Sequence, residues 1–283
     1  MTETPPVVLT IAGFDPSSGA GVTADIKTIA AHGCYGVACL TALTVQSTSG
    51  VKRVETCGSE WVKATLWELA ADLEIGAAHV GMLGSGAVAE VVADFLEEAR
   101  LPRVVLDPIL KSSSGTELLD SSGERALRQR LLPLVDVITP NVDEAALLTG
   151  LPVTNLEQMR KAAAQLHEMG AQAVVVTGGH LEKAIDLLSF RTPRGLEEEV
   201  FKSERQRSNS THGTGCAFAT AMACHLAVDR GLPEAVLLAK AYVSAAIAKA
   251  HPLGKGVGPL HHLYRMDQQR RPASLPQEKE AVH

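Results

Sequence analysis

Short apolar runs alternate along the chain with longer segments in which apolar residues recur at helical spacing. The short runs predict strands at residues 7–11, 37–45, 78–85, 103–106, 135–139, 173–177, 184–190 and 197–201, the last two as an antiparallel pair. The longer segments predict helices at residues 22–31, 59–72, 87–100, 123–132, 141–150, 156–169, 217–226 and 232–250. This order predicts an α/β fold with three layers, in which helices cover both faces of a central, mainly parallel sheet.

Polar or glycine-rich loops follow at least six of the predicted strands. Because the carboxyl ends of parallel strands lie at one edge of a sheet, these loops should converge there and line a ligand site. No internal repeat and no linker divides the sequence, so we expect one domain over residues 1–266. Residues 267–283 are polar and include two prolines, which predicts a disordered tail.

The composition narrows the class of protein. Hydrophobic residues make up 46% of the 283 residues and charged residues 20%, as in soluble globular proteins, and the net charge of -6 disfavours a nucleic-acid partner. No apolar run is long enough for a membrane span, and the N-terminus lacks the features of a signal peptide. The five cysteines are odd in number and lack zinc spacing, which predicts a reduced, cytoplasmic protein. His261 and His262 lack a third ligand at metal spacing, so no metal site is expected there.

The segment 210–216, Ser-Thr-His-Gly-Thr-Gly-Cys, is the strongest candidate for chemistry. Its two glycines predict a tight loop that leads into the apolar helix 217–226, and the unpaired N–H groups at a helix start bind anions. Gly213 and Gly215 would let a phosphate approach closely. Cys216 would lie at the positive end of the helix, where the pKa of a thiol falls. The alternative is an ordinary loop and helix cap, with Cys216 a small core residue.

Other strand ends carry polar residues whose local sequence has two interpretations. Asp15 could face a ligand or close an Asx turn. Gln46 could hydrogen-bond a heterocycle or lie exposed in a loop. Asn141 and Glu144 begin a predicted helix, where such residues are ordinary caps. The loop that contains Lys111 could contact phosphates or form a solvated turn.

Several motifs occur together in the order typical of one enzyme family. They are Ala-Gly-Phe-Asp at 12–15, Ala-Asp-Ile-Lys-Thr at 24–28, Thr-Val-Gln at 44–46, Val-Gly-Met-Leu at 80–83, Asp-Pro at 107–108, Pro-Asn-Val-Asp-Glu at 140–144, Gly-Gly-His at 178–180 and Thr-His-Gly-Thr-Gly-Cys at 211–216. Over residues 7–265 the sequence thereby resembles the hydroxymethylpyrimidine/phosphomethylpyrimidine kinases of thiamine biosynthesis. The resemblance implies a ribokinase-like fold, ATP and Mg²⁺ as cofactors, and two successive phosphorylations of 4-amino-5-hydroxymethyl-2-methylpyrimidine, to the monophosphate and then the diphosphate.

The resemblance also implies roles for individual residues. The substrate would be bound by Gly13, Asp15, Asp25, Gln46, Met82 and Ile109. ATP and Mg²⁺ would be bound by Asp107, Lys111, Asn141, Glu144, Thr177 and Gly179, with Glu144 acting on the metal indirectly. The anion hole and catalytic group would be Gly213, Thr214, Gly215 and Cys216. In this scheme Cys216 takes the proton of the hydroxymethyl group.

Three positions depart from the family pattern. Phe14 stands where the family usually has Ser, Ser113 takes a position usually held by Lys while Lys111 comes earlier, and Thr177 replaces a Lys before Gly-Gly-His. These departures concern the fit of the substrate and the phosphate contacts, and they leave the class of reaction intact.

Three other functions compete with this interpretation. A pyridoxal or pyridoxine kinase would act on a similar ring that also carries a hydroxymethyl group. A cysteine acyltransferase would use His212 as the base for Cys216, although such a nucleophile usually needs a third group. A non-catalytic sensor would bind a small molecule without ATP. The family resemblance further implies a homodimer, and the apolar helix 232–250 is compatible with an interface or with plain core.

Overall fold

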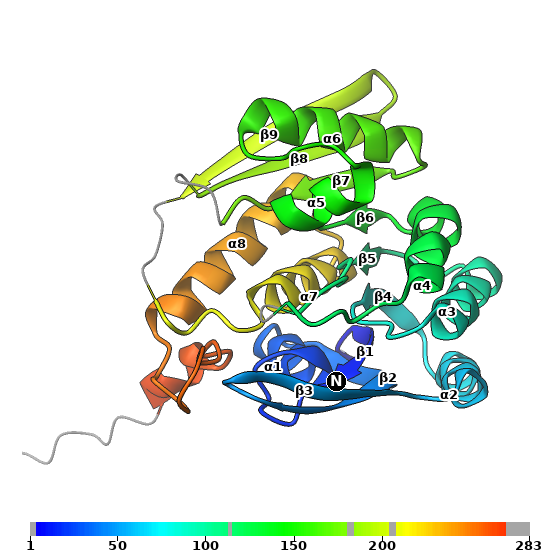
Figure 1. Cartoon of the computed structure of the whole chain (residues 1–283). Coiled ribbons are helices and arrows are strands. Elements are labelled where there is room, and N and C mark those ends of the chain that lie inside the picture. The colour runs from blue at the N-terminus through cyan, green and yellow to red at the C-terminus, as the bar shows by residue number, and fades with distance from the viewer. Residues whose placement is uncertain (1–3, 113–114, 180–183, 204–207, 270–283) are drawn as a thin grey trace, which may run out of the picture.

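The computed structural model describes residues 4–112, 115–179, 184–203 and 208–269. These residues form a nine-stranded sheet with the order β3-β2-β1-β4-β5-β6-β7-β8-β9 (Figure 1). The strands are β1 (Val7–Phe14), β2 (Tyr35–Ser47), β3 (Gly50–Thr56), β4 (Ile75–Val80), β5 (Val104–Leu106), β6 (Val137–Ile138), β7 (Ala173–Val176), β8 (Ala184–Thr192) and β9 (Gly195–Ser203). The α-helices are α1 (Gly21–Ala31), α2 (Ser59–Asp72), α3 (Gly86–Ala99), α4 (Ser121–Ala126), α5 (Val142–Thr149), α6 (Leu156–Glu168), α7 (Thr214–Ala227) and α8 (Leu232–Ala248).

The middle of the sheet is parallel and its margins are antiparallel. Strands β2, β1, β4, β5, β6 and β7 pair in parallel along this order. At one margin β3 pairs antiparallel with β2, and at the other β8 and β9 continue antiparallel from β7. The predicted α/β class with a mainly parallel sheet is confirmed, and so is the antiparallel pairing of the segments 184–190 and 197–201.

Alternate residues of the central strands supply two separate cores. Leu9 and Leu106 pack with side chains of α2, α3, α5 and α6, whereas their neighbours Val8 and Val105 pack with α1, α7 and α8. Successive strand residues point to opposite faces, so a strand that is apolar on both sides must be covered twice. Three layers therefore follow from strands in which almost every residue is apolar.

The strand β3 was not expected from the sequence. Its Lys52, Arg53 and Glu55 are charged and exposed, and none of its residues is fully buried. It is a polar strand at the margin of the sheet, where charged side chains protect the open edge from pairing with other chains. Because it lacks a run of apolar residues, the hydrophobic pattern does not mark it.

Two further boundaries differ from prediction. The expected helix 123–132 is divided into α4, a π-helical turn η1 (Leu127–Leu131) and a 3-10 turn η2 (Leu132–Leu134), and Pro133 lacks the N–H that would continue a regular helix. The 3-10 helix η3 (Tyr264–Gln269) includes the first residues of the expected tail, whose remainder, 270–283, lies outside the described residues. The extent of the single domain, residues 1–266, stays a prediction. None of the described helices is long and apolar enough to cross a membrane.

One buried histidine joins the C-terminal segment to the helix layer. The Nδ1 atom of His262 lies 3.0 Å from the hydroxyl of Thr28, and that hydroxyl donates to the carbonyl of Ala24. His262 Nδ1 therefore carries the proton and donates to Thr28. The hydroxyl of Tyr242 donates to the carbonyl of His262. Burial is the main cause that lowers the pKa of His262 to about 4, with Lys27 adding to it.

We predict that acid destabilises the protein through His262. An unfolded histidine titrates near pH 6.5, so between about pH 6.5 and pH 4 the unfolded chain binds a proton that folded His262 does not. The free energy of unfolding should fall across that window, by up to roughly 3 kcal/mol from this residue. In the variant His262→Asn, which keeps a donor but cannot titrate, urea unfolding at pH 7.5 and pH 5 should show a smaller difference than in the wild type. Equal differences in the two proteins would contradict the assignment.

Candidate active site

The loops at the carboxyl ends of the parallel strands are tied to one another. The hydroxyl of Thr44 on β2 donates to the carbonyl of Phe14 at the end of β1. The N–H of Asp107, after β5, donates to the carbonyl of Val80 at the end of β4. Asn141, after β6, forms a parallel bridge with Thr177, after β7. The predicted convergence of these loops at one edge is therefore seen, and the start of α7 lies against the same edge.

The anion loop, residues 210–216, leads into a helix that begins three residues earlier than expected. Gly213 caps α7 with φ +80°, and the helix starts at Thr214. The N–H groups of Gly215 and Cys216 belong to the first turn, where no helical carbonyl can accept them. A Cβ atom on Gly213 would lie 2.0 Å from the carbonyl oxygen of Gly19. A glycine is thus required both by the backbone angle and by the contact with the 13–21 loop.

Cys216 is a buried thiol and not the activated thiolate that the helix start suggested. Burial raises the pKa of Cys216 well above its usual range, and the charges of Asp107 and Asp25 raise it further. A hydrogen bond from Gly21 N–H opposes this rise. The expectation of a lowered pKa was wrong because the sequence does not show two carboxylates behind the helix start. Cys216 keeps its proton at neutral pH and is hydrogen-bonded to Asp107.

Asp25 is held by a buried polar network, and its role in substrate binding stays a prediction. It is fully buried, and its two carboxylate oxygens accept hydrogen bonds from Thr10 at 2.7 Å and Thr220 at 2.9 Å. Its Oδ2 atom is also 3.3 Å from Nδ1 of buried His79. Burial alone would lower the pKa of His79, but the charge and hydrogen bond of Asp25 raise it. This placement gives no support to direct contact between Asp25 and a substrate, and it assigns Asp25 to a polar network beneath α7.

Asp107 connects that network to the anion loop. The position of a Cβ on Gly215 would be 3.5 Å from its Oδ2 atom, so the carboxylate borders the start of α7. Burial raises the pKa of Asp107 to about 6; His79 lowers it and Asp25 raises it. Neither Asp107 nor His79 was singled out from local sequence for this electrostatic role, because β4 and β5 bring them together only in the folded sheet.

Asn141 and Glu144 form a complete capping box on α5. The side chain of Asn141 accepts the N–H groups of Asp143 and Glu144, both at 2.9 Å, and Glu144 Oε2 accepts the N–H of Asn141 at 2.9 Å. Both residues are therefore true helix caps, the interpretation that local sequence favoured. Burial, and after it the charge of Asp107, raise the pKa of Glu144 to about 8.

The donor set at this edge fits a hard divalent cation. Asp107 is buried and Glu144 is half-buried, and burial and, less strongly, the charge of a neighbouring carboxylate raise the pKa of each. Such mutual repulsion is relieved when a cation supplies positive charge. Mg²⁺ takes oxygen ligands and is commonly held by one or two carboxylates together with substrate phosphates. Asp107 and Glu144 match that arrangement.

Asp15 closes the first loop and holds a histidine. Its carboxylate accepts hydrogen bonds from the N–H and hydroxyl of Ser17 at 2.8 and 2.7 Å and from Ala20 N–H at 2.9 Å. Its Oδ2 atom is 2.8 Å from Nε2 of His212. Burial would raise the pKa of Asp15, but the hydrogen bonds from His212 and Ser17 hold it below its usual value. The turn interpretation of Asp15 is the one that the geometry supports.

His212 also reaches Gln46. Its Nε2 atom is 3.1 Å from the Gln46 amide, which is half-buried beside the Thr44 hydroxyl at 3.2 Å. Gln46 is therefore held in place at the end of β2 and is not a free loop residue. His212 thus links Asp15 to Gln46, while the Cys216 thiol is hydrogen-bonded to Asp107. This arrangement does not favour a His212–Cys216 pair and weighs against the acyltransferase.

A small apolar cluster lies between these polar groups. Met82 and Ile109 pack with Ala42 and Leu118. A Cβ on Gly13 would lie 2.9 Å from the sulfur of Met82, so the absence of a side chain leaves room for that thioether. The structure therefore brings together Gly13, Met82 and Ile109, the three apolar residues expected to line the substrate pocket; their role in binding stays a prediction.

The remaining predicted nucleotide contacts lie around the ends of β5 and β7. Thr177 N–H donates to the carbonyl of Pro140, and Gly179 is exposed. The N–H of Gly178 donates to buried Asp186, which is also ion-paired with Lys240 of α8. Lys111 is exposed, and its backbone forms an isolated antiparallel bridge with that of Glu117. Two positions named above, Ser113 and His180, lie outside the described residues.

The sequence matches the family described as phosphomethylpyrimidine kinase over residues 15–261. It is 43% identical over 260 residues to a hydroxymethylpyrimidine/phosphomethylpyrimidine kinase of Streptomyces coelicolor, covering 92% of this chain and 95% of that protein. Its fold is similar to the crystal structure of phosphomethylpyrimidine kinase from Clostridium difficile, with a TM-score of 0.76 and 34% identity over 86% of this chain and 99% of that one. It is also similar to the ADP complex of Bacillus subtilis pyridoxal kinase, with a TM-score of 0.84 and 34% identity over 93% of this chain and 100% of that one.

These similarities extend over nearly all of the residues that form the sheet and its loops. They confirm the ribokinase-like fold and the resemblance that the motifs suggested. The chain therefore belongs to the phosphomethylpyrimidine kinase family.

Proposed function

We propose that this chain transfers the γ-phosphoryl group of ATP to 4-amino-5-hydroxymethyl-2-methylpyrimidine and then phosphorylates the monophosphate to the diphosphate. The observation that carries the proposal is the open start of α7, which lies beside Asp107 at the sheet edge where the apolar cluster of Gly13, Met82 and Ile109 also lies. An anion site next to a small apolar pocket suits a phosphate donor and an aromatic acceptor. The names of the relatives agree with this assignment.

In this reaction the protein mainly positions the reactants and neutralises charge. The hydroxymethyl oxygen attacks the γ-phosphorus in line, a new O–P bond forms, and the bond to the leaving oxygen of ADP breaks. The N–H groups of Gly215 and Cys216 stabilise charge on the transferring group. Glu144 would help to hold Mg²⁺ indirectly, the charge of Asp107 would attract the ion, and the metal would neutralise the phosphate oxygens. The Gln46 amide, fixed by Thr44 and His212, hydrogen-bonds the ring.

The raised pKa of Cys216 shapes the proton transfer. A thiol that keeps its proton cannot accept another, so Cys216 must pass its own proton to Asp107 as it takes the one from the hydroxymethyl group. Asp107 already accepts the hydrogen bond of the thiol, and its pKa of about 6 lets it hold a proton transiently near neutral pH. In the second phosphorylation the attacking phosphate oxygen is already anionic, so this transfer is not needed.

A pyridoxal kinase is the second candidate function. The observation that favours it is the similarity of the fold to the Bacillus subtilis pyridoxal kinase, whose TM-score of 0.84 exceeds the 0.76 of the phosphomethylpyrimidine kinase. The sequence comparisons favour the pyrimidine substrate. Phe14, at the end of β1 beside the pocket, is the first residue to examine if pyridoxal is used.

We extend the proposal to a homodimer that works in the cytoplasm. Leu43 and Val45 on β2 are 48% and 56% exposed on the side of the hairpin opposite Gln46, where a second copy of the chain would cover them. All five cysteines are free thiols, which suits a reducing compartment. Sedimentation should show that the wild type is a dimer and that Leu43→Glu is a monomer. A monomeric wild type would contradict the proposed homodimer.

A product assay tests the central proposal. The full chain is incubated with ATP, Mg²⁺ and hydroxymethylpyrimidine, with pyridoxal in a parallel reaction, and the products are identified by mass spectrometry. We expect the pyrimidine to gain one and then two phosphates. If only pyridoxal is phosphorylated, the proposed substrate is wrong but the proposed mechanism of phosphoryl transfer stands. If neither compound is phosphorylated, the result favours a non-catalytic small-molecule sensor.

We predict that Cys216→Ala slows the first phosphorylation much more than the second. Loss of a general base typically costs about 100-fold or more, whereas the second step should change by less than about tenfold. Each step is measured separately, with hydroxymethylpyrimidine or its monophosphate as the starting substrate. Cys224→Ala is the matched control, because Cys224 is a buried thiol of the same helix, two turns beyond Cys216. An equal loss in both steps would indicate that Cys216 only shapes the site.

We also predict that Glu144→Gln weakens Mg²⁺-dependent turnover. Glutamine preserves the capping box, so α5 should remain intact while one negative charge is lost. The Mg²⁺ concentration for half-maximal rate should rise by roughly tenfold. Asp143→Asn, an exposed acidic neighbour in the same turn, should change it little. An unchanged Mg²⁺ requirement in Glu144→Gln would rule out the role given to Glu144.

A further inference from the structure

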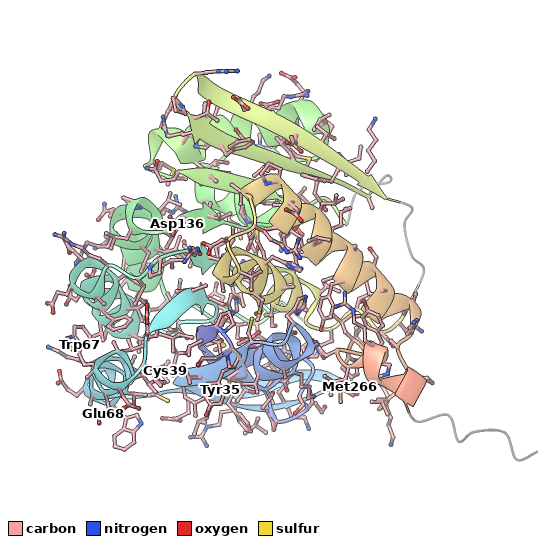
Figure 2. All side chains as sticks on the ribbon, turned by 180° about the vertical axis from the view of Figure 1, so that it is seen from behind. Tyr35, Cys39, Trp67, Glu68, Asp136 and Met266 are labelled. Carbon is pink, nitrogen blue, oxygen red and sulfur yellow. The ribbon has the colours of Figure 1, made fainter. Side chains whose placement is uncertain are left out.

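Three metal-binding side chains meet at the foot of α8, outside the site described above. His251 follows the end of α8, His261 comes ten residues later, and Asp267 lies in η3. One ligand atom from each lies within 4.8 Å of the others. Figure 1 shows this segment in orange and red below α8, and Figure 2 marks η3 by its exposed Met266 at the outer margin of the molecule.

The fold, and not the sequence spacing, creates this cluster. The N–H of His261 donates to the carbonyl of Ala246 in the last turns of α8, so the chain returns to the point from which it left the helix. This brings the ring centroids of His251 and His261 to 5.1 Å. The Nε2 atom of His261 is 2.7 Å from Oδ2 of Asp267. The sequence spacing shows no third ligand for His261 because its neighbours in the fold come from ten residues before and six residues after it.

We infer that His251, His261 and Asp267 form a binding site for a borderline divalent transition-metal ion such as Zn²⁺. Two imidazoles and one carboxylate suit Zn²⁺ and are poor ligands for Mg²⁺, so this site and the nucleotide site select different ions. Three protein ligands leave a fourth position for water. All three side chains are at least partly exposed, so an ion can enter from solvent.

Only small movements of these three side chains are needed for them to bind a metal ion. In a tetrahedral zinc site with bonds of about 2.0–2.2 Å, neighbouring ligand atoms are roughly 3.4 Å apart. The His261–Asp267 pair must therefore open from 2.7 Å, and the widest pair must close from at most 4.8 Å. Rotations of exposed side chains can supply shifts of roughly 1 Å. His261 gives up the hydrogen bond to Asp267, and its Nε2 proton leaves as the metal binds.

By binding His251 and His261, the ion would connect the two ends of a segment that contacts the candidate active site. This segment, residues 251–261, is called the strap here. Inside it, Val257 N–H donates to the carbonyl of Thr48 at 2.9 Å, beside the turn between β2 and β3. The carbonyl of Gly258 accepts the N–H of His212 at 3.1 Å, in the anion loop. A metal that joins His251 to His261 closes the strap into a ring and should restrict its opening.

Metal titration of the full chain without an affinity tag tests the site. The protein is treated with EDTA, freed of the chelator, and titrated with Zn²⁺ against a chromophoric competitor, with millimolar Mg²⁺ present throughout. We expect one equivalent of Zn²⁺ to bind and Mg²⁺ not to displace it. His251→Asn and His261→Asn should each lower the affinity for Zn²⁺ by at least about tenfold.

Two control variants show where the ion binds. His225→Asn removes a histidine of α7 that is not part of the cluster, and Cys216→Ser removes the thiol of the anion loop; both should bind Zn²⁺ like the wild type. Wild-type affinity in His251→Asn and His261→Asn, or loss of binding in Cys216→Ser, would overturn the assignment.

Hydrogen exchange tests the link to the strap. Zn²⁺ should slow exchange of the Val257 and His212 amides in the wild type and leave them unchanged in His251→Asn. If Zn²⁺ binds to the cluster without slowing either amide, the fastening of the strap is refuted while the metal site stands. Neither measurement depends on kinase activity, so the result is independent of the proposed function.

Discussion

The candidate active-site edge of this protein is governed by the removal of carboxylates from water, to which repulsion between neighbouring carboxylates adds. Asp25, Asp107 and Glu144 lie on three different elements, and the charge of one raises the pKa of the next. His79 compensates part of this charge from below, through its contact with Asp25. The remaining negative charge must be neutralised either by protons or by a cation. This constraint explains why Cys216 remains a thiol, why Glu144 holds a proton near neutrality, and why the edge suits a metal–nucleotide complex.

The two halves of the site are separated by the start of α7. On one side, His212 donates to Asp15 and lies close to the Gln46 amide, and Met82 and Ile109 form an apolar cluster. On the other, the capping box of α5 places Glu144 beside Asp107. In the proposed reaction, the acceptor and the phosphate donor would thus meet different chemical surroundings.

Many of the strands and the convergence of the loops were predicted from the sequence. The incorrect predictions have a common cause. Apolar runs predicted the strands that are buried on both faces, and the motifs predicted which loops would meet. β3 was not predicted, because a polar strand at the margin of a sheet has no apolar run. Asp25 and Cys216 were assigned from local motifs, but their surroundings come from β1, β4, β5 and α7, which the local motifs do not show. His251 and His261 were missed because their contact depends on the return of the chain to α8.

The close contact between Gly19 and Gly213 has a consequence for the order in which the protein is made. Nearly two hundred residues separate these glycines, and the backbone of one fills the space where the other would carry a side chain. During synthesis the first loop emerges early but has no partner until the anion loop leaves the ribosome. Contacts of such long sequence separation form late. The nascent chain can therefore assemble most of its sheet before the first loop meets the anion loop, so the geometry at the start of α7 is among the last parts of the fold to be completed.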